Sequence, residues 1–366
     1  MSKIAIIDTA IDSKLIGNKA IKSINLCGGE TSILDDRGNH EVTHGTLCAM
    51  VLNHCASDYE LVNIRIFNDN SVKVFGQIEL LANALRLCRD LKVDIISLSA
   101  VSSILSDSKK ILDTTLELSR DSVIVSALDN ARYITIPASY PHVLGVSNDN
   151  AGLLKLGEIA FCPDNPFRVN IYANSDFDFL HHYECGPSNS LAVPVVVAFI
   201  NDLLNRGKTK TEIEIMLQTL KPYPLRNEHI DRDRLPRPAK VEIPIVFAVF
   251  ESTTICSAMM DSLFDQYEVQ SSALSFVEGH YDIRIQTIVD IECVESELCF
   301  MENHYKTDLI FIIGSENHLN EIKDKIEIDV ELIQRSDCKT LFRYDTGDML
   351  VPNFDVVYRL HKLLSE

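Results

Sequence analysis

The chain has 366 residues and a net charge of −19, with 46% hydrophobic and 24% charged residues. This length allows two domains of ordinary size, and the composition is that of a folded protein without low-complexity tracts. The acidic balance excludes the strongly basic surface that nucleic-acid binding requires. Residues 241–366 carry most of the charge, with 24 acidic against 9 basic residues. Such a surface serves solubility or attracts a basic peptide or protein.

The N-terminal stretch MSKIAIIDTAID contains an apolar run of only four residues, Ile4 to Ile7, which ends at Asp8. This run is too short for a signal-peptide core or a membrane-spanning helix, so we expect a cytoplasmic protein without a membrane partner. The ten cysteines are scattered without a CxxC pair. We therefore expect free thiols, no disulfides and no zinc.

The first 220 residues alternate strand-like apolar runs with helical patterns. The expected strands are 3–8, 61–67, 93–99, 122–128 and 142–147. The expected helices are 78–91, 111–119, 193–205 and 210–220, with another opening at His44. Strands separated by helices of these lengths predict right-handed βαβ units on a parallel sheet.

A linker is predicted after this part of the chain, because residues 221–240 hold four prolines and many charges. The predicted organisation is a first domain at 1–222, a linker at 223–240 and an acidic second domain at 241–366. In the second domain, strands are expected at 241–250, 283–288, 308–314 and 328–334, and helices at 254–266, 316–326 and 353–365. This alternation predicts a smaller α/β domain.

Three residues in the first domain carry candidate chemistry. Asp8 ends the first expected strand. In open parallel sheets, ligands bind at the carboxyl ends of the strands. A carboxylate that is buried there needs a hydrogen-bonding partner. His44 opens an apolar helix, and Ser190 lies at the start of another, where its backbone N–H points out of the helix. Singly, they are explained as a turn former, a helix N-terminal residue and a helix cap. Together they supply a nucleophile, a base and an orienting acid.

The order Asp8, His44, Ser190, with each residue in its own local pattern, resembles the subtilases, the subtilisin-like serine peptidases. The aspartate, histidine and serine motifs of that family are matched by IAIIDTAID (4–12), HGTLCAM (44–50) and SNSLAVP (188–194). Further similar segments are SVIVSALDN (122–130), which ends at the oxyanion asparagine, VDIISLS (93–99), beside the substrate cleft, and IPASYPHVLGVSN (136–148). The resemblance covers residues 3–220.

The resemblance implies a subtilisin-like α/β fold, a parallel sheet with helices on both faces, beside the second, smaller α/β domain. It implies a serine endopeptidase in which Ser190 attacks a peptide carbonyl, His44 accepts its proton and Asp8 orients the imidazole. The Asn130 side chain and the Ser190 N–H would form the oxyanion hole. The residues implied to bind substrate are Ser97, Ser99 and Ala100. Neither a cofactor nor a metal is implied.

The chain departs from the family pattern in three glycine-containing motifs. Ser188 replaces the glycine two residues before the nucleophile, and Asp129 replaces the glycine before the asparagine. The cleft strand, which ends S-x-G-G in the family, reads Ser99-Ala100-Val101 here, with side chains in place of glycines. These changes favour an alternative, a catalytically impaired scaffold of the same fold that binds a peptide or a partner protein. The three retained candidate residues favour the peptidase. Ser188 is the fallback nucleophile if the motif register is different.

Other motifs carry weaker signals. His181, His182 and Cys185 have metal-binding side chains, but adjacent histidines point to different sides. Cys48 is expected to be a small buried residue rather than a second nucleophile. The turn at 251–254 lacks the glycines and lysine of a phosphate-binding loop, so we do not expect nucleotide binding.

The substrate class follows from the resemblance and the domain organisation. No propeptide is expected, because Asp8 lies almost at the first residue. An intracellular subtilase with an extra α/β domain resembles the peptidases that remove leaders from ribosomally made, modified peptides. This implies a peptide or precursor-peptide substrate, with a general intracellular peptidase as the neighbouring possibility. The second domain would dock a substrate or partner, or mediate self-association.

Overall fold

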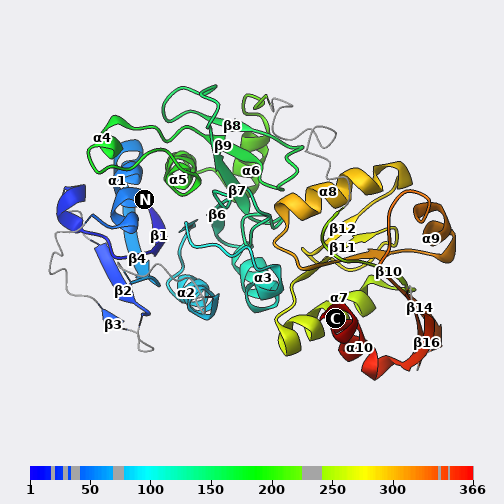
Figure 1. Ribbon diagram of the computed structural model, residues 1–366. Helices are drawn as coiled ribbons and strands as arrows, with labels where there is room; N and C mark the ends of the chain where they lie inside the picture. The colour runs from blue at the N-terminus through cyan, green and yellow to red at the C-terminus, as the bar shows by residue number, and fades with distance from the viewer. Residues whose placement is uncertain are drawn as a thin grey trace. The chain divides into compact units, whose positions relative to one another are not determined.

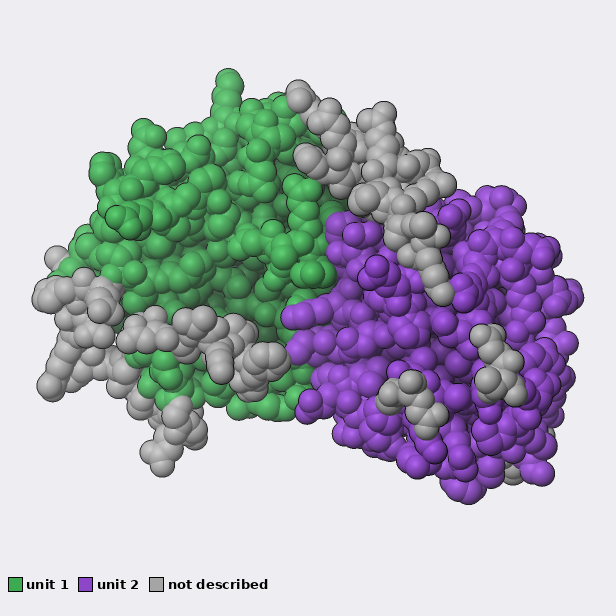
Figure 2. Space-filling model, viewed as in Figure 1, with its two compact units in different colours: residues 1–103, 107–225 green, residues 104–106, 226–366 purple. Residues whose placement is uncertain are grey.

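The computed structural model describes residues 1–17, 21–27, 32–33, 42–68, 78–224, 241–336, 339–344 and 347–365. The chain divides into two compact units, coloured separately in Figure 2. Unit 1 comprises residues 1–103 and 107–225, and unit 2 comprises 104–106 and 226–366. The predicted linker lies outside the described residues from position 225 to 240. Within the described ranges, no helix has the length and apolar character needed to cross a membrane.

Unit 1 is built on a sheet with the strand order β3-β2-β4-β1-β5-β6-β7-β9-β8 (Figure 1). Neighbouring strands are parallel except at the two edges, where β3 and β8 run antiparallel to β2 and β9. The strands are β1 (Ser2–Asp8), β2 (Ile21–Asn25), β3 (Ser32–Ile33), β4 (Tyr59–Arg65), β5 (Ile95–Leu98), β6 (Val123–Ala127), β7 (Leu144–Asn148), β8 (Ile159–Phe161) and β9 (Ile171–Ala173).

The five strands predicted in this unit are confirmed as β1, β4, β5, β6 and β7. They are central strands with nearly every residue buried, which is why the sequence shows them as continuous apolar runs. The edge strands β3 and β8 and the neighbouring strand β9 have only two or three residues, and β2 has one buried residue. Such segments are too short or too polar to show a hydrophobic period.

Helices cover both faces of the sheet. Figure 1 shows α1 and α5 side by side on one face and α2 and α3 together on the other, as their contacts require. The helices of unit 1 are α1 (His44–Cys55), α2 (Ile78–Asp90), α3 (Ser108–Leu118), α4 (Asp178–His181), α5 (Asn189–Asn205) and α6 (Lys210–Gln218). This arrangement confirms the predicted α/β fold of the first domain.

The buried helix α5 begins at Asn189, and the Ser188 hydroxyl caps it by accepting a hydrogen bond from the Leu191 N–H. The expected helix 193–205 would have Pro194 in its first turn, but because α5 begins at Asn189, Pro194 lies in the second turn, inside the helix. Because proline has no N–H, the Ser190 carbonyl loses its usual bond to the residue four positions ahead. The Cys48 thiol of α1 donates to this carbonyl at 3.8 Å. Contact between the two helices thus partly satisfies the group that Pro194 leaves free.

Unit 2 contains a second mixed sheet, with the order β12-β11-β13-β10-β14-β15-β16. Its strands are parallel up to β14, and β15 and β16 add an antiparallel hairpin at one edge. The strands are β10 (Ile245–Val249), β11 (Ser271–Ser275), β12 (Ile285–Thr287), β13 (Leu309–Ile313), β14 (Val330–Ser336), β15 (Lys339–Tyr344) and β16 (Gly347–Pro352). The helices are α7 (Thr253–Tyr267), α8 (Val294–His304), α9 (Glu316–Ile322) and α10 (Val356–Ser365).

The predicted α/β character of the second part is therefore confirmed. The sequence pattern did not predict β11, α8 or the hairpin. Three of the five residues of β11 are serines, although all five are buried, so composition concealed the strand. The hairpin strands have mixed burial, with exposed residues on β15 and β16, and lack a clear alternation.

Candidate active site

Asp8 lies at the carboxyl end of the central strand β1, with only 2% of its surface exposed. Its Oδ1 accepts hydrogen bonds from the Thr9 N–H at 2.6 Å and from the Thr9 hydroxyl at 3.0 Å. Its Oδ2 lies 2.8 Å from His44 Nδ1. The carboxylate therefore has partners on both oxygens, as a buried charge requires.

The first turn of α1 is held against the end of β1. The Gly45 N–H donates to the Thr9 hydroxyl at 2.7 Å. A Cβ on Gly45 would lie 2.7 Å from the Thr9 carbonyl oxygen, so only glycine fits this approach. Thr43 caps the helix by accepting from the Thr46 N–H. These contacts place His44, the first residue of α1, beside Asp8.

His44 lies between the acid and the serine. Its Nδ1 faces Asp8, and its Nε2 lies 2.8 Å from Ser190 Oγ. An ionised carboxylate only accepts hydrogen bonds, so Nδ1 carries the proton that is donated to Asp8. In the neutral imidazole, Nε2 then has a free lone pair and accepts from the Ser190 hydroxyl. The predicted residues Asp8, His44 and Ser190 thus form one continuous hydrogen-bonded chain.

The pKa values of the first two residues follow from this contact. Burial acts to raise the pKa of Asp8, but His44 and Thr9 lower it, and the net result is a lowered pKa. Cys48 is the largest influence on His44 and raises its pKa. Burial lowers the pKa of His44, Asp8 raises it, and the net result is a pKa above the usual value of histidine. Asp8 therefore stays ionised throughout the pH range in which His44 titrates.

The geometry distinguishes between the two candidate serines. Ser190 Oγ contacts His44, whereas the Ser188 hydroxyl caps α5 and lies 3.0 Å from Ser190 Oγ. Ser188, which replaces a glycine in the family pattern, thus contacts the candidate nucleophile directly. The sequence pattern does not reveal this hydrogen bond.

Asn130 lies at the surface, next to the residue that precedes Ser190. Its Oδ1 accepts from the Asn189 N–H at 3.2 Å. Its Nδ2 has no acceptor among the residues described by the structure, so it is free to donate to another molecule. The Asp129 carboxylate accepts from the Ala131 N–H at 2.7 Å, which holds it in its own turn.

Asn189 is a buried positioning residue that the sequence motif alone does not reveal. Its Nδ2 donates to the carbonyl oxygens of Leu128 and Asp129, and its Oδ1 accepts from the Asn148 N–H at 2.8 Å. These bonds join the first turn of α5 to the segments at the ends of β6 and β7. They fix the distance between the Asn130 turn and Ser190. A local capping pattern carries no signal for contacts with residues about 40 and 60 positions away.

One of the residues expected to bind substrate is inaccessible. Ser97 lies in the middle of the sheet, 1% exposed, and is paired on one side with β1 and on the other with β6. Neither its side chain nor its backbone is available to a peptide, which corrects that prediction. Ser99 and Ala100 follow the end of β5, and the Ser99 hydroxyl lies 3.5 Å from Cys48 Sγ. They remain proposed substrate contacts.

The candidate metal ligands His181, His182 and Cys185 do not form a metal site in the described parts of the chain. His181 is exposed and pairs with Asp176 at 3.0 Å, and no group of three metal-binding side chains includes His181, His182 or Cys185 there. The described cysteines are free thiols, while Cys338 lies outside the described residues. Cys48 is buried as expected, but it contacts the site as well as the core.

No family model matches the chain, and no curated protein is similar to it at a significant level. The solved structures that it resembles include the prenylagaramide maturation protease PagA, with 17% identity, 57% of this chain and 78% of that chain covered, and a TM-score of 0.37. A lanthipeptide protease has 14% identity, 65% and 81% coverage, and a TM-score of 0.43. The patellamide maturation protease PatA has 15% identity, 57% and 81% coverage, and a TM-score of 0.39. These structural neighbours are subtilisin-like proteases, and at such identities the similarity concerns the fold alone.

Proposed function

We propose that this protein is a serine endopeptidase that cleaves peptide bonds through an acyl-enzyme intermediate. The observation that carries the proposal is the chain of two 2.8 Å contacts that joins Asp8, His44 and Ser190. The carboxylate is buried, the imidazole is in the required tautomer, and the hydroxyl is at a helix N-terminus. A scaffold that only binds peptides does not require this combination.

In the proposed mechanism, His44 Nε2 removes the proton from Ser190 as its Oγ attacks the substrate carbonyl carbon. Asp8 stabilises the imidazolium that forms. The Ser190 N–H and the Asn130 Nδ2 donate to the negative oxygen of the tetrahedral intermediate. His44 then gives its proton to the leaving amine. Water next attacks the carbonyl of the acyl-enzyme while His44 accepts its proton, and that proton passes to Ser190 Oγ as the ester bond breaks.

A fluorophosphonate tests this proposal because it reacts with an activated serine. We expect a single adduct on Ser190, located by intact-mass spectrometry and peptide mapping of the full chain. The Ser190→Ala variant should form none. Ser188→Ala is the matched control, two residues away, and should still be labelled because Ser190 and His44 are unchanged. Folded protein that forms no adduct, or an adduct that maps to Ser188, would contradict the assignment and favour the scaffold function.

The narrower proposal is that the substrate is a precursor peptide from which a leader is removed. Its support is the second α/β unit, whose acidic composition is complementary to a basic peptide segment. The test compares kcat/KM for a precursor peptide and for the same peptide without the distal part of its leader. Docking through the leader predicts at least a tenfold lower value for the shortened peptide, or about 1.4 kcal/mol. Equal values would favour a general peptidase.

A further inference from the structure

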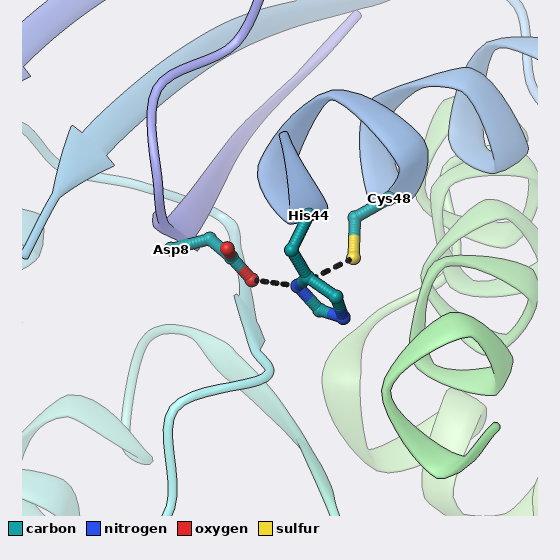
Figure 3. Close-up of side chains that lie close together, drawn as sticks. All are labelled: Asp8, His44 and Cys48. Atoms are coloured by element: carbon teal, nitrogen blue, oxygen red, sulfur yellow. Dashed lines mark hydrogen bonds and ion pairs between the residues drawn. The ribbon is translucent and has the colours of Figure 1, made fainter. Parts of the chain in front are cut away.

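Asp8, His44 and Cys48 form a cluster of three different metal-binding side chains at the candidate active site (Figure 3). Asp8 comes from the end of β1, and His44 and Cys48 lie one turn apart on α1. Figure 3 shows the three side chains converging on His44 Nδ1. Asp8 Oδ2 is 2.8 Å from this nitrogen and Cys48 Sγ is 3.8 Å from it. All three ligand atoms lie within 4.8 Å of one another.

These distances are close to those of a zinc site. With zinc bonds of about 2.0 Å to nitrogen or oxygen and 2.3 Å to sulfur, tetrahedral ligands lie about 3.3–3.6 Å apart. The Nδ1–Sγ distance is already near this range, and the carboxylate must move away from Nδ1 by less than 1 Å. The carboxylate oxygen and Cys48 Sγ, within 4.8 Å of each other, must also approach to this range. Thiolate, imidazole and carboxylate together also suit zinc better than calcium or magnesium, which select oxygen ligands.

We propose that Asp8, His44 and Cys48 bind a zinc ion that switches the active site off. The ion takes the lone pair of His44 Nδ1, so the single imidazole proton moves to Nε2. The Cys48 thiol releases its proton to solvent and binds as thiolate. His44 Nε2 is then a hydrogen-bond donor and can no longer accept the Ser190 proton. Only this inhibitory consequence rests on the proposed peptidase function; the metal site itself does not.

The route to the site and the role of Cys48 support the proposal. The His44 side chain is 39% exposed, whereas that of Asp8 is 2% exposed and Cys48 is fully buried, so an ion enters beside the imidazole. In the structure, the Cys48 thiol donates to the Ser190 carbonyl. A serine at position 48 keeps such a donor but is a poor zinc ligand. Cys48→Ser therefore separates the proposed metal site from the structural role of the residue.

The binding experiment uses the full chain with Ser190→Ala, which removes any peptidase activity and leaves the three ligands intact. We expect it to bind one Zn²⁺ by calorimetry. One Co²⁺ should bind with the near-ultraviolet absorption of a cobalt–thiolate bond. Adding Cys48→Ser should abolish that absorption and weaken Zn²⁺ binding more than about 100-fold, since even an outer partner of a metal ligand contributes 10- to 100-fold. Cys55→Ser, at the exposed end of the same helix, is the matched control and should change neither.

The activity experiment uses chains that retain Ser190. Zn²⁺ should suppress fluorophosphonate labelling in the original chain and the Cys55→Ser variant, and a chelator should restore it. The Cys48→Ser variant should stay labelled in the presence of zinc. The site is overturned if the original and Cys48→Ser chains bind Zn²⁺ equally, or if no cobalt–thiolate absorption forms. Metal binding without labelling under any condition would instead reject the peptidase function and leave the metal site standing.

Discussion

Replacing Asp8 with asparagine is expected to lower kcat/KM for peptide cleavage by about 10⁴-fold, while the protein stays folded. Both Thr9 donors point at Oδ1 of residue 8, so the asparagine amide oxygen must face Thr9. Its NH₂ group then faces His44 and makes Nδ1 an acceptor. The imidazole proton moves to Nε2, where it blocks proton transfer from Ser190. The variant therefore keeps the shape of the site and loses its base.

Kinetics with a fluorogenic peptide measure this effect. Asp94→Asn is a suitable control, because Asp94 accepts from the Lys3 N–H at the amino-terminal end of the same sheet and has no contact with the site. It should change kcat/KM by less than about threefold, as expected for a surface substitution within 0.5 kcal/mol. A similar kcat/KM for Asp8→Asn and Asp94→Asn would show that the contact between Asp8 and His44 does not set the tautomer.

The pH profile gives a second readout of the same variant. Activity requires neutral His44, so kcat/KM rises with pH as this residue loses its proton. The raised pKa of His44 should place the acid limb of the original protein above pH 6.5. The residual activity of Asp8→Asn should have its acid limb at lower pH, because the carboxylate charge that favours the imidazolium is lost.

Replacing Asn130 with alanine is expected to lower kcat by about 10²- to 10³-fold with little change in KM. The Asn189 N–H holds Oδ1, and this contact leaves Nδ2 as the free donor of the side chain. The negative charge on the substrate oxygen develops only in the transition state. Loss of the donor therefore affects the chemical step more than substrate binding.

A second substitution shows whether the donor or the packing matters. Asn130→Asp keeps an oxygen that can accept from the Asn189 N–H but places a negative charge where the amide would donate. It should lower kcat at least as much as Asn130→Ala. If Asn130→Asp retains the original kcat, the Asn130 side chain is not an oxyanion donor, and the Ser190 N–H must be supplemented by another group.

The sequence by itself determined the parts of the fold that depend on local pattern. The buried central strands appear as continuous apolar runs, and α2 and α10 appear as amphipathic periods. Asp8 at a strand end and His44 at a helix start are also local features, because each follows from the residues on either side of it. The short edge strands β3 and β8 and the hairpin of β15 and β16 escaped prediction, because short length or mixed burial leaves no regular alternation of apolar and polar residues.

Only the tertiary structure decided how these features form a site. The His44 contacts join residues 36 and 146 positions apart, and sheet pairing and the packing of α1 against α5 set those distances. The same packing selects Ser190 over Ser188 and excludes Ser97 by burial. It also places Cys48 where a thiol contacts His44 and the carbonyl freed by Pro194. Local periodicity fixes which face of an element is apolar, but side chains distant in sequence meet only when whole elements pack.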